Sequence, residues 1–269
     1  HQSVQQHRFG KLRALERWLA GRASRWFGQF VPTTSIVHLH GVWESILMSA
    51  ARAARAANVP YILAPHGMLD PWSLTQHRWK KRVALRLGHR GMLKRAAAMH
   101  VLNQDEADLL QPLKLAVPIT IIPNGVFGEE VADIPPSEEF ASQHRELRGR
   151  PYILFLSRLH YKKGLDYLAD AFAAIAPGHP DVDLVVAGPD EGARAGFEAQ
   201  IAKAGLADRV HLTGPLYGRG KLAALAGARC FCLPSRQEGF SMAIVEAMGC
   251  GIPVVISEAC HFPEVQSVG

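Results

Sequence analysis

Short apolar runs alternate with longer stretches of helical periodicity along almost the whole chain. In the first half, strands are predicted at four runs rich in β-branched residues, namely residues 35–40, 61–64, 98–102 and 119–122. Helices are predicted between them at residues 44–57, 76–95 and 104–110. Because strands buried on both faces are apolar throughout, this alternation predicts parallel sheets covered by helices on both faces.

The second half repeats the alternation after a segment of different character. Residues 129–150 contain six acidic residues, two adjacent prolines and little apolar periodicity, which predicts an interdomain linker. Beyond it, strands are predicted at residues 152–156, 184–187, 210–213, 230–233 and 253–256, and helices at residues 165–176, 193–204, 221–226 and 242–248. We therefore expect an α/β protein of two Rossmann-like domains, residues 1–147 and 148–269, that face each other across a cleft.

The pattern is incomplete at both ends. A basic amphipathic segment at residues 11–27 stands where a first strand is expected, and no helix follows the last strand. We therefore expect both domains to be truncated and the chain to be a fragment of a longer protein. The opening residues resemble no secretory signal, no window reaches the roughly 18 apolar residues that span a bilayer, and the four cysteines form no CxxC pair. These features favour a cytoplasmic protein with reduced thiols.

Positive charge is concentrated in the first half. Residues 1–123 hold 17 lysines and arginines against 6 acidic residues, whereas the second half has an acidic excess. The predicted helix at residues 76–95 carries eight of these cations and no acid, with Trp79 and Leu87 among them. Such a helix suits either an anionic membrane surface, as in a peripheral protein at the inner face of a membrane, or an ordinary domain helix with a basic polar face. Both interpretations stay open at this point.

Candidate chemistry gathers in the loops that follow the strands of the second half, where the ligands of open α/β sheets bind. Arg158 and Lys163 lie in the segment SRLHYKKG, directly after the strand at residues 152–156. Two cations beside a helix start can neutralise a diphosphate, the task that a metal ion performs in other enzymes that use sugar nucleotides. The loop is therefore a candidate phosphate site.

A second candidate loop lies in the segment EGFSMAIVE. Ser241 is placed as the N-cap of the following helix, so that the backbone amides of Gly239, Phe240 and Ser241 form an anion site. Glu238 precedes this site, while Glu246 lies inside the helix and is placed to accept hydrogen bonds from ribose hydroxyls. Amide donors between two carboxylates suit a ligand with both phosphates and hydroxyls, such as a nucleotide sugar.

Other candidates follow further strands. Gly188 permits close approach of the backbone, and Leu216 offers a wall for a planar base. In the first half, His66 follows a strand in APHGM and is placed either to bond a sugar hydroxyl or the leaving phosphate, or to serve the structure. His38 and His40 share a strand face, but the sequence supplies no carboxylate or third ligand at a spacing that fits a metal. No metal site is expected.

The segments SRLHYKKG, VVAGPDEG, HLTGP and EGFSMAIVEAMGCGIPVV together resemble the retaining glycosyltransferases of family four, which have the GT-B fold. In the first half, HLHGVW, APHGMLDPW, HVLNQDEA and IPNGV resemble the acceptor-side domain of that family. The resemblance extends from about residue 37 to residue 269. Two features of the family have no counterpart in the sequence, namely the glycine-rich loop after the first strand and the closing C-terminal helix.

The resemblance implies a role for each candidate. Arg158 and Lys163 would bind the donor diphosphate, Glu246 would bind the ribose, and Glu238 would lie near the sugar. The loop from Glu238 to Ser241 would hold sugar hydroxyls and phosphate through its backbone. His66 would contact the transferred sugar or assist the reaction.

On the acceptor side, the resemblance points to His40, Gly41 and Asn103. Leu102 and Asn103 stand where relatives often carry a pair of serines or threonines. The implied activity is metal-independent, retaining transfer of a hexose from a nucleoside-diphosphate sugar to a lipid-linked or glycan acceptor in cell-surface or exopolysaccharide synthesis. It needs no cofactor and no nucleic acid.

Two other classes of function fit parts of the sequence. A sugar-nucleotide epimerase or a phosphorylase could use the same two-domain fold. The epimerase would need no acceptor, and the phosphorylase would carry a lysine-bound pyridoxal. A non-catalytic module could instead use the basic first half to bind a membrane or a nucleic acid. The aromatic residues there are not interleaved with the cations as a platform for stacking bases requires.

Overall fold

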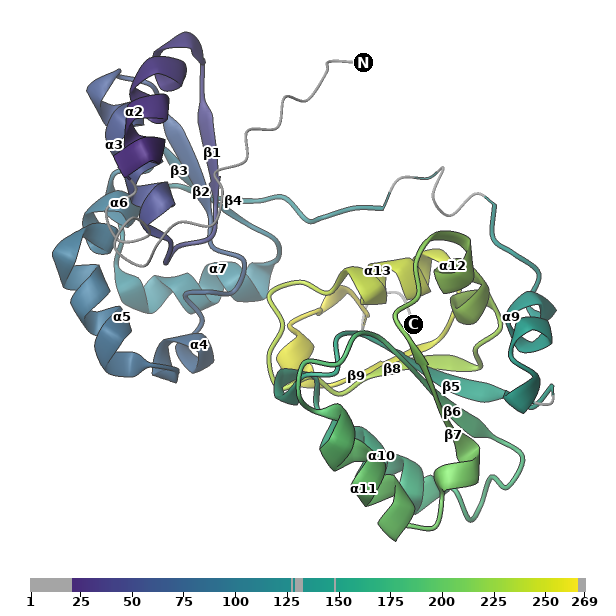
Figure 1. Cartoon of the computed structure of the whole chain (residues 1–269). Helices are drawn as coiled ribbons and strands as arrows, with labels where there is room; N and C mark the ends of the chain where they lie inside the picture. Colours follow the sequence, from purple (N-terminus) through teal and green to yellow (C-terminus); the bar gives the residue numbers. More distant parts are fainter. Residues whose placement is uncertain (1–20, 127, 129–132, 148, 266–269) are drawn as a thin grey trace. The chain divides into compact units, whose positions relative to one another are not determined.

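The computed structural model describes residues 21–126, 128, 133–147 and 149–265 (Figure 1). The chain divides into two compact units, His1–Pro123 and Asn124–Gly269, and each contains one parallel sheet. Each unit also has its own hydrophobic core. The α/β class and the two parallel sheets predicted from the sequence are therefore confirmed.

The sheet of the first unit has the strand order β1-β2-β3-β4, so that consecutive strands are neighbours. Its strands are β1 (Val37–His40), β2 (Tyr61–Ala64), β3 (Ala98–Val101) and β4 (Ile119–Ile121). Its longer helices are α2 (Gly21–Phe30), α3 (Ser45–Ala56) and α7 (Gln104–Leu110). All four predicted strands are present. Strands β2 and β3 bury apolar residues such as Leu63 and Met99, whereas the residues of β4 are exposed. Of the segment expected to be amphipathic at residues 11–27, residues 11–20 lie outside the described residues.

The prediction of a single helix at residues 76–95 is wrong. Helix α4 (Pro71–Thr75) begins earlier, with Asp70 accepting hydrogen bonds from the backbone amides of Trp72 and Ser73. The chain then turns at His77 and forms α5 (Arg78–Ala84), a π-helical turn (Leu85–His89) and α6 (Arg90–Lys94). The break falls at Gly88, whose φ of 141° is outside the helical region and is accessible to glycine because it lacks a Cβ atom.

The second unit has five parallel strands in the order β7-β6-β5-β8-β9. They are β5 (Tyr152–Leu156), β6 (Asp183–Ala187), β7 (Val210–Gly214), β8 (Cys230–Leu233) and β9 (Val254–Ile256). Helices α10 (Leu165–Ile175) and α11 (Arg194–Lys203) lie on one side of this sheet, and α12 (Gly218–Ala226) and α13 (Met242–Gly249) lie on the other (Figure 1). The chain builds outward from β5 in one direction and then returns to build from β8 in the other. The sheet therefore has a topological switch point between β5 and β8.

The linker expected at residues 129–150 is partly structured. Helix α9 (Glu138–Gln143) and the turn that follows it bury Phe140 and Leu147 in the core of the second unit, beside Tyr152. The compact units accordingly divide at Pro123 and Asn124, earlier than the expected boundary between residues 147 and 148. The two buried apolar residues are isolated among acidic ones, so they give no clear helical pattern in the sequence.

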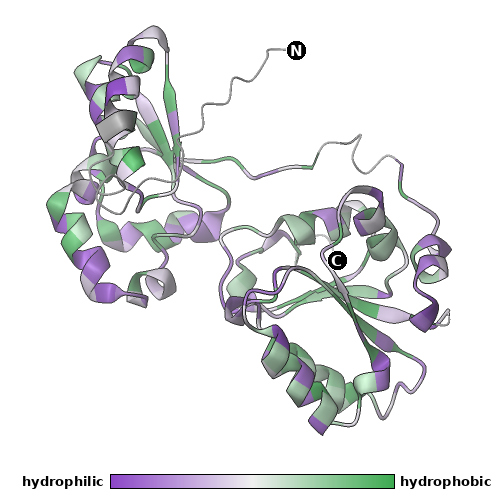
Figure 2. Ribbon diagram, in the orientation of Figure 1, coloured by the Kyte–Doolittle hydropathy of each residue, from purple (hydrophilic) through white to green (hydrophobic). Residues whose placement is uncertain are grey.

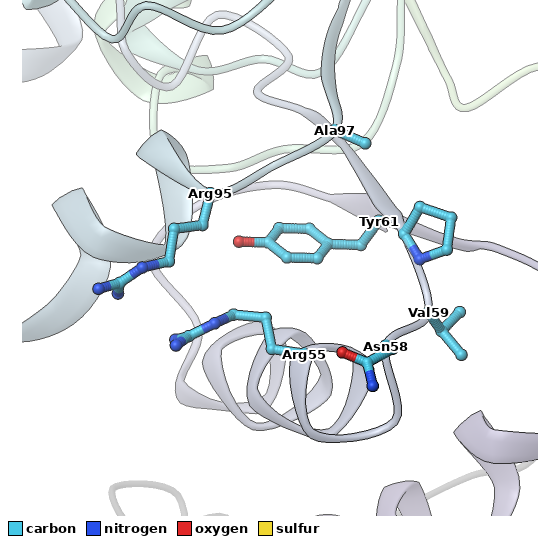
Figure 3. A pocket seen from close by; sticks show the side chains of 7 residues that line it. Arg55, Asn58, Val59, Tyr61, Arg95 and Ala97 are labelled. Carbon is cyan, nitrogen blue, oxygen red and sulfur yellow. The ribbon is translucent and has the colours of Figure 1, made fainter.

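A cavity of about 370 Å³ lies in the first unit (Figure 3). It is lined by Arg55, Asn58, Val59, Pro60, Tyr61, Arg95 and Ala97, which surround the amino ends of β2 and β3. The hydroxyl of Tyr61 donates to the carbonyl oxygen of Met92, 2.6 Å away, so the ring is fixed at one wall. Ligands of open parallel sheets bind at the carboxyl ends of strands, and the candidate residues lie at those ends. This cavity is therefore separate from the candidate site.

The expectation of a cytoplasmic protein rests on the cysteines and on the helices of the chain. Cys230, Cys232, Cys250 and Cys260 are all unpaired thiols. Burial raises the pKa of the Cys232 thiol to about 12, so this thiol is protonated and unreactive at neutral pH. Within the described residues, no helix is long and apolar enough to cross a membrane.

Candidate functional site

The loops after β5 and β8 meet at the switch point of the second unit. Strands β5 and β8 pair in parallel, with Ile153 opposite Cys230, so that both chains leave the sheet at the same edge. A Cβ atom on Gly164 would lie 1.9 Å from the carbonyl oxygen of Pro234, so the two loops are in backbone contact there. Gly164 also has a φ of 68°, which favours glycine. The position is the one at which open α/β sheets bind ligands.

A buried ion pair joins these loops. The ammonium nitrogen of Lys163 lies 2.6 Å from Oε1 of Glu238, and the side chains are 11% and 8% exposed. The hydroxyl of Ser235 donates to the same carboxylate oxygen, also at 2.6 Å. The backbone amide of Glu238 donates to the carbonyl oxygen of Ala259, which fixes the loop that carries the carboxylate. Two of the residues predicted from separate motifs therefore form one rigid charged centre.

Arg158 forms a different ion pair. Its guanidinium lies 2.7 Å from Oε2 of Glu191, in the loop after β6, and both side chains are exposed. The backbone supports this neighbourhood, because the amide of Glu191 donates to the carbonyl oxygen of Leu159. The structure thus places the two predicted diphosphate cations at the same edge of the sheet but in separate ion pairs.

Helix α13 begins at the predicted residue. Ser241 is its N-cap and is buried, although its side chain makes no capping hydrogen bond within the described residues. The preceding residue, Phe240, packs against Phe262 with the ring centroids 5.0 Å apart. The loop ahead of the helix, including Gly239, is therefore held by packing and by the buried N-cap. Because the first amides of a helix have no intrahelical partner, this loop stays a candidate anion site.

Glu246 is held by a lysine that the sequence analysis missed. The ammonium nitrogen of Lys221 lies 2.8 Å from Oε1 of Glu246, and both side chains are partly buried. Lys221 comes from α12 and Glu246 from α13, two helices that lie on the same side of the sheet (Figure 1). The signal in the sequence is a lysine early in the helix after β7. Its partner is 25 positions away and cannot be identified from spacing.

Gly188 and Leu216 lie in the loops after β6 and β7, at the same edge of the sheet. Gly188 has a φ of 151°, and a Cβ atom there would lie 1.8 Å from the carbonyl oxygen of Ser157. The close approach that the sequence predicts is thus between the loops after β5 and β6. Leu216 is partly buried and packs against the core of the unit, so part of its side chain is available as a wall.

In the first unit, four histidines form a cluster at the carboxyl end of the sheet. Nδ1 of His40 lies 2.8 Å from Nε2 of His66, and their rings are stacked with centroids 5.1 Å apart. Nδ1 of His100 lies 3.2 Å from Nε2 of His38, and the rings of His38 and His40 are 4.2 Å apart. His100 was missed because its 62-residue separation from His38 hides the pairing.

Two of the four histidines disfavour positive charge. Burial lowers the pKa of both His38 and His66, and the neighbouring histidines lower it further. No group of three or more histidine, cysteine, aspartate or glutamate side chains in the described part of the chain is arranged to hold a metal ion. The lowered pKa favours the neutral imidazole of His38 and of His66, which keeps their hydrogen-bonding capacity.

The backbone around His66 is held by a buried glutamate. Glu106 accepts hydrogen bonds from the backbone amides of Gly67, at 2.7 Å, and Leu102, at 2.9 Å. Burial nevertheless raises its pKa. His66 itself has a φ of 51°, a conformation that is uncommon for residues other than glycine. Such strain at a strand end is typical of functional positions.

The three acceptor-side candidates differ in exposure. His40 has an exposed side chain, whereas Asn103 is 1% exposed. The amide oxygen of Asn103 accepts from the backbone amide of Glu106 and caps α7, so its observed role is structural. Gly41 is buried, and its amide donates to the carbonyl oxygen of Ala64.

Family comparisons cover both units. Residues 136–267 match the family described as glycosyl transferases group 1, and residues 2–125 match the glycosyl transferase 4-like domain. Together the two matches account for almost the entire chain. The chain belongs to the glycosyltransferases.

Individual glycosyltransferases agree with this assignment. The chain is 31% identical to the 2-deoxystreptamine glucosyltransferase of Streptomyces kanamyceticus over 230 residues, which covers 81% of this chain and 57% of the relative. It is 30% identical to the lipopolysaccharide core biosynthesis mannosyltransferase LpsB of Rhizobium meliloti over 168 residues, which covers 58% of this chain and 45% of the relative. The chain therefore spans about half the length of the curated relatives it matches.

Solved structures show the same fold. The crystal structure of HepE from Anabaena in complex with UDP and glucose superimposes with a TM-score of 0.72 at 22% identity, and covers 92% of this chain and 65% of that chain. A sucrose-phosphate synthase from Thermosynechococcus elongatus gives a TM-score of 0.69 at 20% identity, and covers 89% of this chain and 61% of that chain. The two-sheet architecture is that of the GT-B glycosyltransferases, as the sequence predicts.

Proposed function

We propose that this glycosyltransferase moves a hexose from a nucleoside-diphosphate sugar to a lipid-linked or glycan acceptor in the synthesis of a cell-surface or exported polysaccharide. The main support is the charged centre of Lys163 and Glu238 at the switch point of the second unit. The relatives include mannosyl- and glucosyltransferases, and the HepE structures contain UDP or UDP-glucose. The second unit would hold the donor, and the first unit would hold the acceptor.

The donor diphosphate would be bound by lysine and by backbone amides. An ammonium group has three donors, so Lys163 can keep Glu238 and still reach a phosphate oxygen. The amides at the start of α13 would add further donors, and Arg158 would contribute by leaving its exposed pair with Glu191. These positive groups would stabilise the negative charge that develops on the departing diphosphate, the role that a metal ion has in other enzymes. The proposed reaction therefore needs no metal.

The ribose and the sugar would be bound by the two glutamates. Lys221 occupies Oε1 of Glu246, which leaves Oε2 to accept hydrogen bonds from the ribose hydroxyls. Glu238 is oriented by Lys163 and Ser235 and would lie beside the hexose. His66 would present a neutral imidazole to a sugar hydroxyl, with His40 fixing its ring. We further propose that the anomeric configuration of the donor is retained, in keeping with the resemblance to family four.

The proposal is tested by product analysis. The protein is incubated with UDP-, GDP- and ADP-hexoses, and transfer of the hexose to water is followed by NMR, which also reports the anomeric configuration of the hexose first released. We expect one donor to be consumed with retention, and Lys163→Met to abolish the reaction while Lys203→Met, at an exposed position on α11, preserves it. Inversion would refute the stereochemical part, and full activity of Lys163→Met would refute the site.

A further inference from the structure

Three large apolar side chains are exposed along α5 and the π-helical turn after it. Trp79, Val83 and Leu87 are 67%, 45% and 65% exposed. Their spacing of four residues places them along one face of the helix. Scattered apolar residues are normal at a surface, but a row of three with a tryptophan at one end marks an interaction surface.

Exposed cations flank this row. They are Arg78, Lys80, Arg82, Arg86 and Arg90. Within the described residues none of the five forms an ion pair, and the sequence holds no acidic residue from 71 to 104. Most arginines of the second unit, in contrast, have an acidic partner, as in Arg150 with Asp183 and Arg236 with Asp166. The charge on α5 is therefore not neutralised by the described part of the protein.

The inner face of the same helical region is anchored. Lys81 donates hydrogen bonds to the backbone oxygen and the hydroxyl of Ser73, and its ammonium lies 5.2 Å from the ring centroid of Trp43. His89 is buried, with Nδ1 3.0 Å from the carbonyl oxygen of Ala84. The helix is thus fixed on one side and presents apolar and basic residues on the other. In Figure 2 α5 carries both hydrophobic and hydrophilic turns.

We propose that this α5 surface, made of Trp79, Val83, Leu87 and the five flanking cations, docks on an anionic lipid bilayer. The apolar side chains would enter the boundary between headgroups and acyl chains, and the cations would contact the headgroup phosphates. A nucleic acid would match the charge but would leave Val83 and Leu87 without an apolar environment. A bilayer of anionic lipids satisfies both parts of the surface.

This inference goes beyond the proposed function, because none of its residues belongs to the donor site. Docking through α5 would bring the first unit to the surface at which a lipid-linked acceptor is embedded. It would also hold without any transfer activity, since adsorption of an amphipathic surface needs only charge attraction and apolar burial. Its failure and the failure of the proposed function are therefore separate outcomes.

The test is co-sedimentation of the full chain with vesicles of phosphatidylcholine alone and of phosphatidylcholine with phosphatidylglycerol, at low and high salt. We expect binding to the anionic vesicles only, and weaker binding as salt rises because the headgroup attraction is screened. Absence of binding to anionic vesicles overturns the proposal. Equal binding to both vesicle types does so too.

Two double variants separate the contributions of charge and apolar contact. Trp79→Ser with Leu87→Ser and Arg82→Glu with Arg86→Glu should each weaken partitioning by at least about tenfold. Lys114→Glu with Lys203→Glu changes the net charge equally at exposed positions elsewhere and should have a smaller effect. Unchanged binding of the Trp79/Leu87 variant, or equal losses in the control, would overturn the α5 surface. Circular dichroism and nucleotide binding check that each variant is folded.

Discussion

Lys163 and Glu238 are separated by 75 positions in the sequence, yet their charged atoms lie 2.6 Å apart. One residue follows β5 and the other follows β8, so the pair spans the switch point of the second sheet. Both side chains are almost completely buried, and the carboxylate also accepts from Ser235. The pair is therefore a fixed part of the fold as well as the proposed centre of the donor site.

The burial of this pair predicts strong coupling in a double-mutant cycle. Lys163→Met and Glu238→Gln should each destabilise the protein, and Lys163→Met by about 3–5 kcal/mol because Glu238 is left buried and uncompensated. The double variant should lose less than the sum. Urea unfolding measures each change. Arg158→Met breaks an exposed pair and should cost less than about 1 kcal/mol; additive effects at Lys163 and Glu238 would contradict the buried pairing.

Glu246 should bind the ribose of the nucleotide and not its phosphates. Glu246→Gln is expected to weaken binding of the nucleoside diphosphate by roughly tenfold, because a charge-assisted hydrogen bond to ribose is lost. Pyrophosphate, which has no ribose, should bind equally to both proteins. Titration calorimetry gives both affinities. Glu198→Gln is the matched control, since Glu198 is an exposed helical glutamate paired with Arg194. A parallel loss for pyrophosphate would assign Glu246 to the phosphates instead.

Gly188 should tolerate no side chain. Gly188→Ala places a methyl group against the carbonyl oxygen of Ser157 at a φ of 151°, and should destabilise the protein by more than about 2 kcal/mol. Gly196→Ala provides the control, because Gly196 lies in α11 with open space around it. That change should stabilise the helix by about 0.5–1 kcal/mol. Thermal and urea unfolding measure the stability of both variants. Equal effects of Gly188→Ala and Gly196→Ala would contradict the close approach.

The histidine cluster predicts an acid-sensitive first unit. The folded pKa of His38 and of His66 is lowered, so the unfolded chain binds protons more readily and folding loses stability as pH falls below about 6.5. His40 and His100 face these rings, and Glu106 interacts with His100. His38→Gln with His66→Gln should reduce the difference in unfolding free energy between pH 7.5 and pH 5. An unchanged difference would show that the two imidazoles are not responsible.

The fold was predictable because its strongest signal is local. Buried parallel strands such as Tyr152–Leu156 are continuous apolar runs, and the nine strands in the described part of the chain lie where the sequence predicts strands. Gly88 looks like an ordinary helix glycine in the sequence, and only its φ reveals the break after α5. Phe140 and Leu147 escaped notice because two buried residues among acidic ones make no periodic pattern.

The proximity of the candidate residues could be predicted from the sequence, but their pairing could not. Position after a strand identified Lys163, Glu238 and Glu246, because ligands bind where parallel strands end. Their partners depend on long-range contacts, and Lys221 therefore appeared only in the structure. Asn103 has a structural role that its position could have indicated. It precedes a helix as an N-cap should, and its amide oxygen accepts from the backbone amide of Glu106, while its role on the acceptor side stays a prediction.

The central claim is that the switch point of the second unit binds the nucleoside diphosphate of the donor. Titration calorimetry of the chain with UDP, GDP and ADP, in the wild type, Lys163→Met, the Lys163→Met/Glu238→Gln double variant and Lys203→Met, tests it most directly. We expect at least one nucleotide to bind to the wild type and to Lys203→Met, with at least about tenfold weaker binding in both variants that lack Lys163. Undiminished affinity in the folded double variant would contradict it, as would the absence of binding to all three nucleotides.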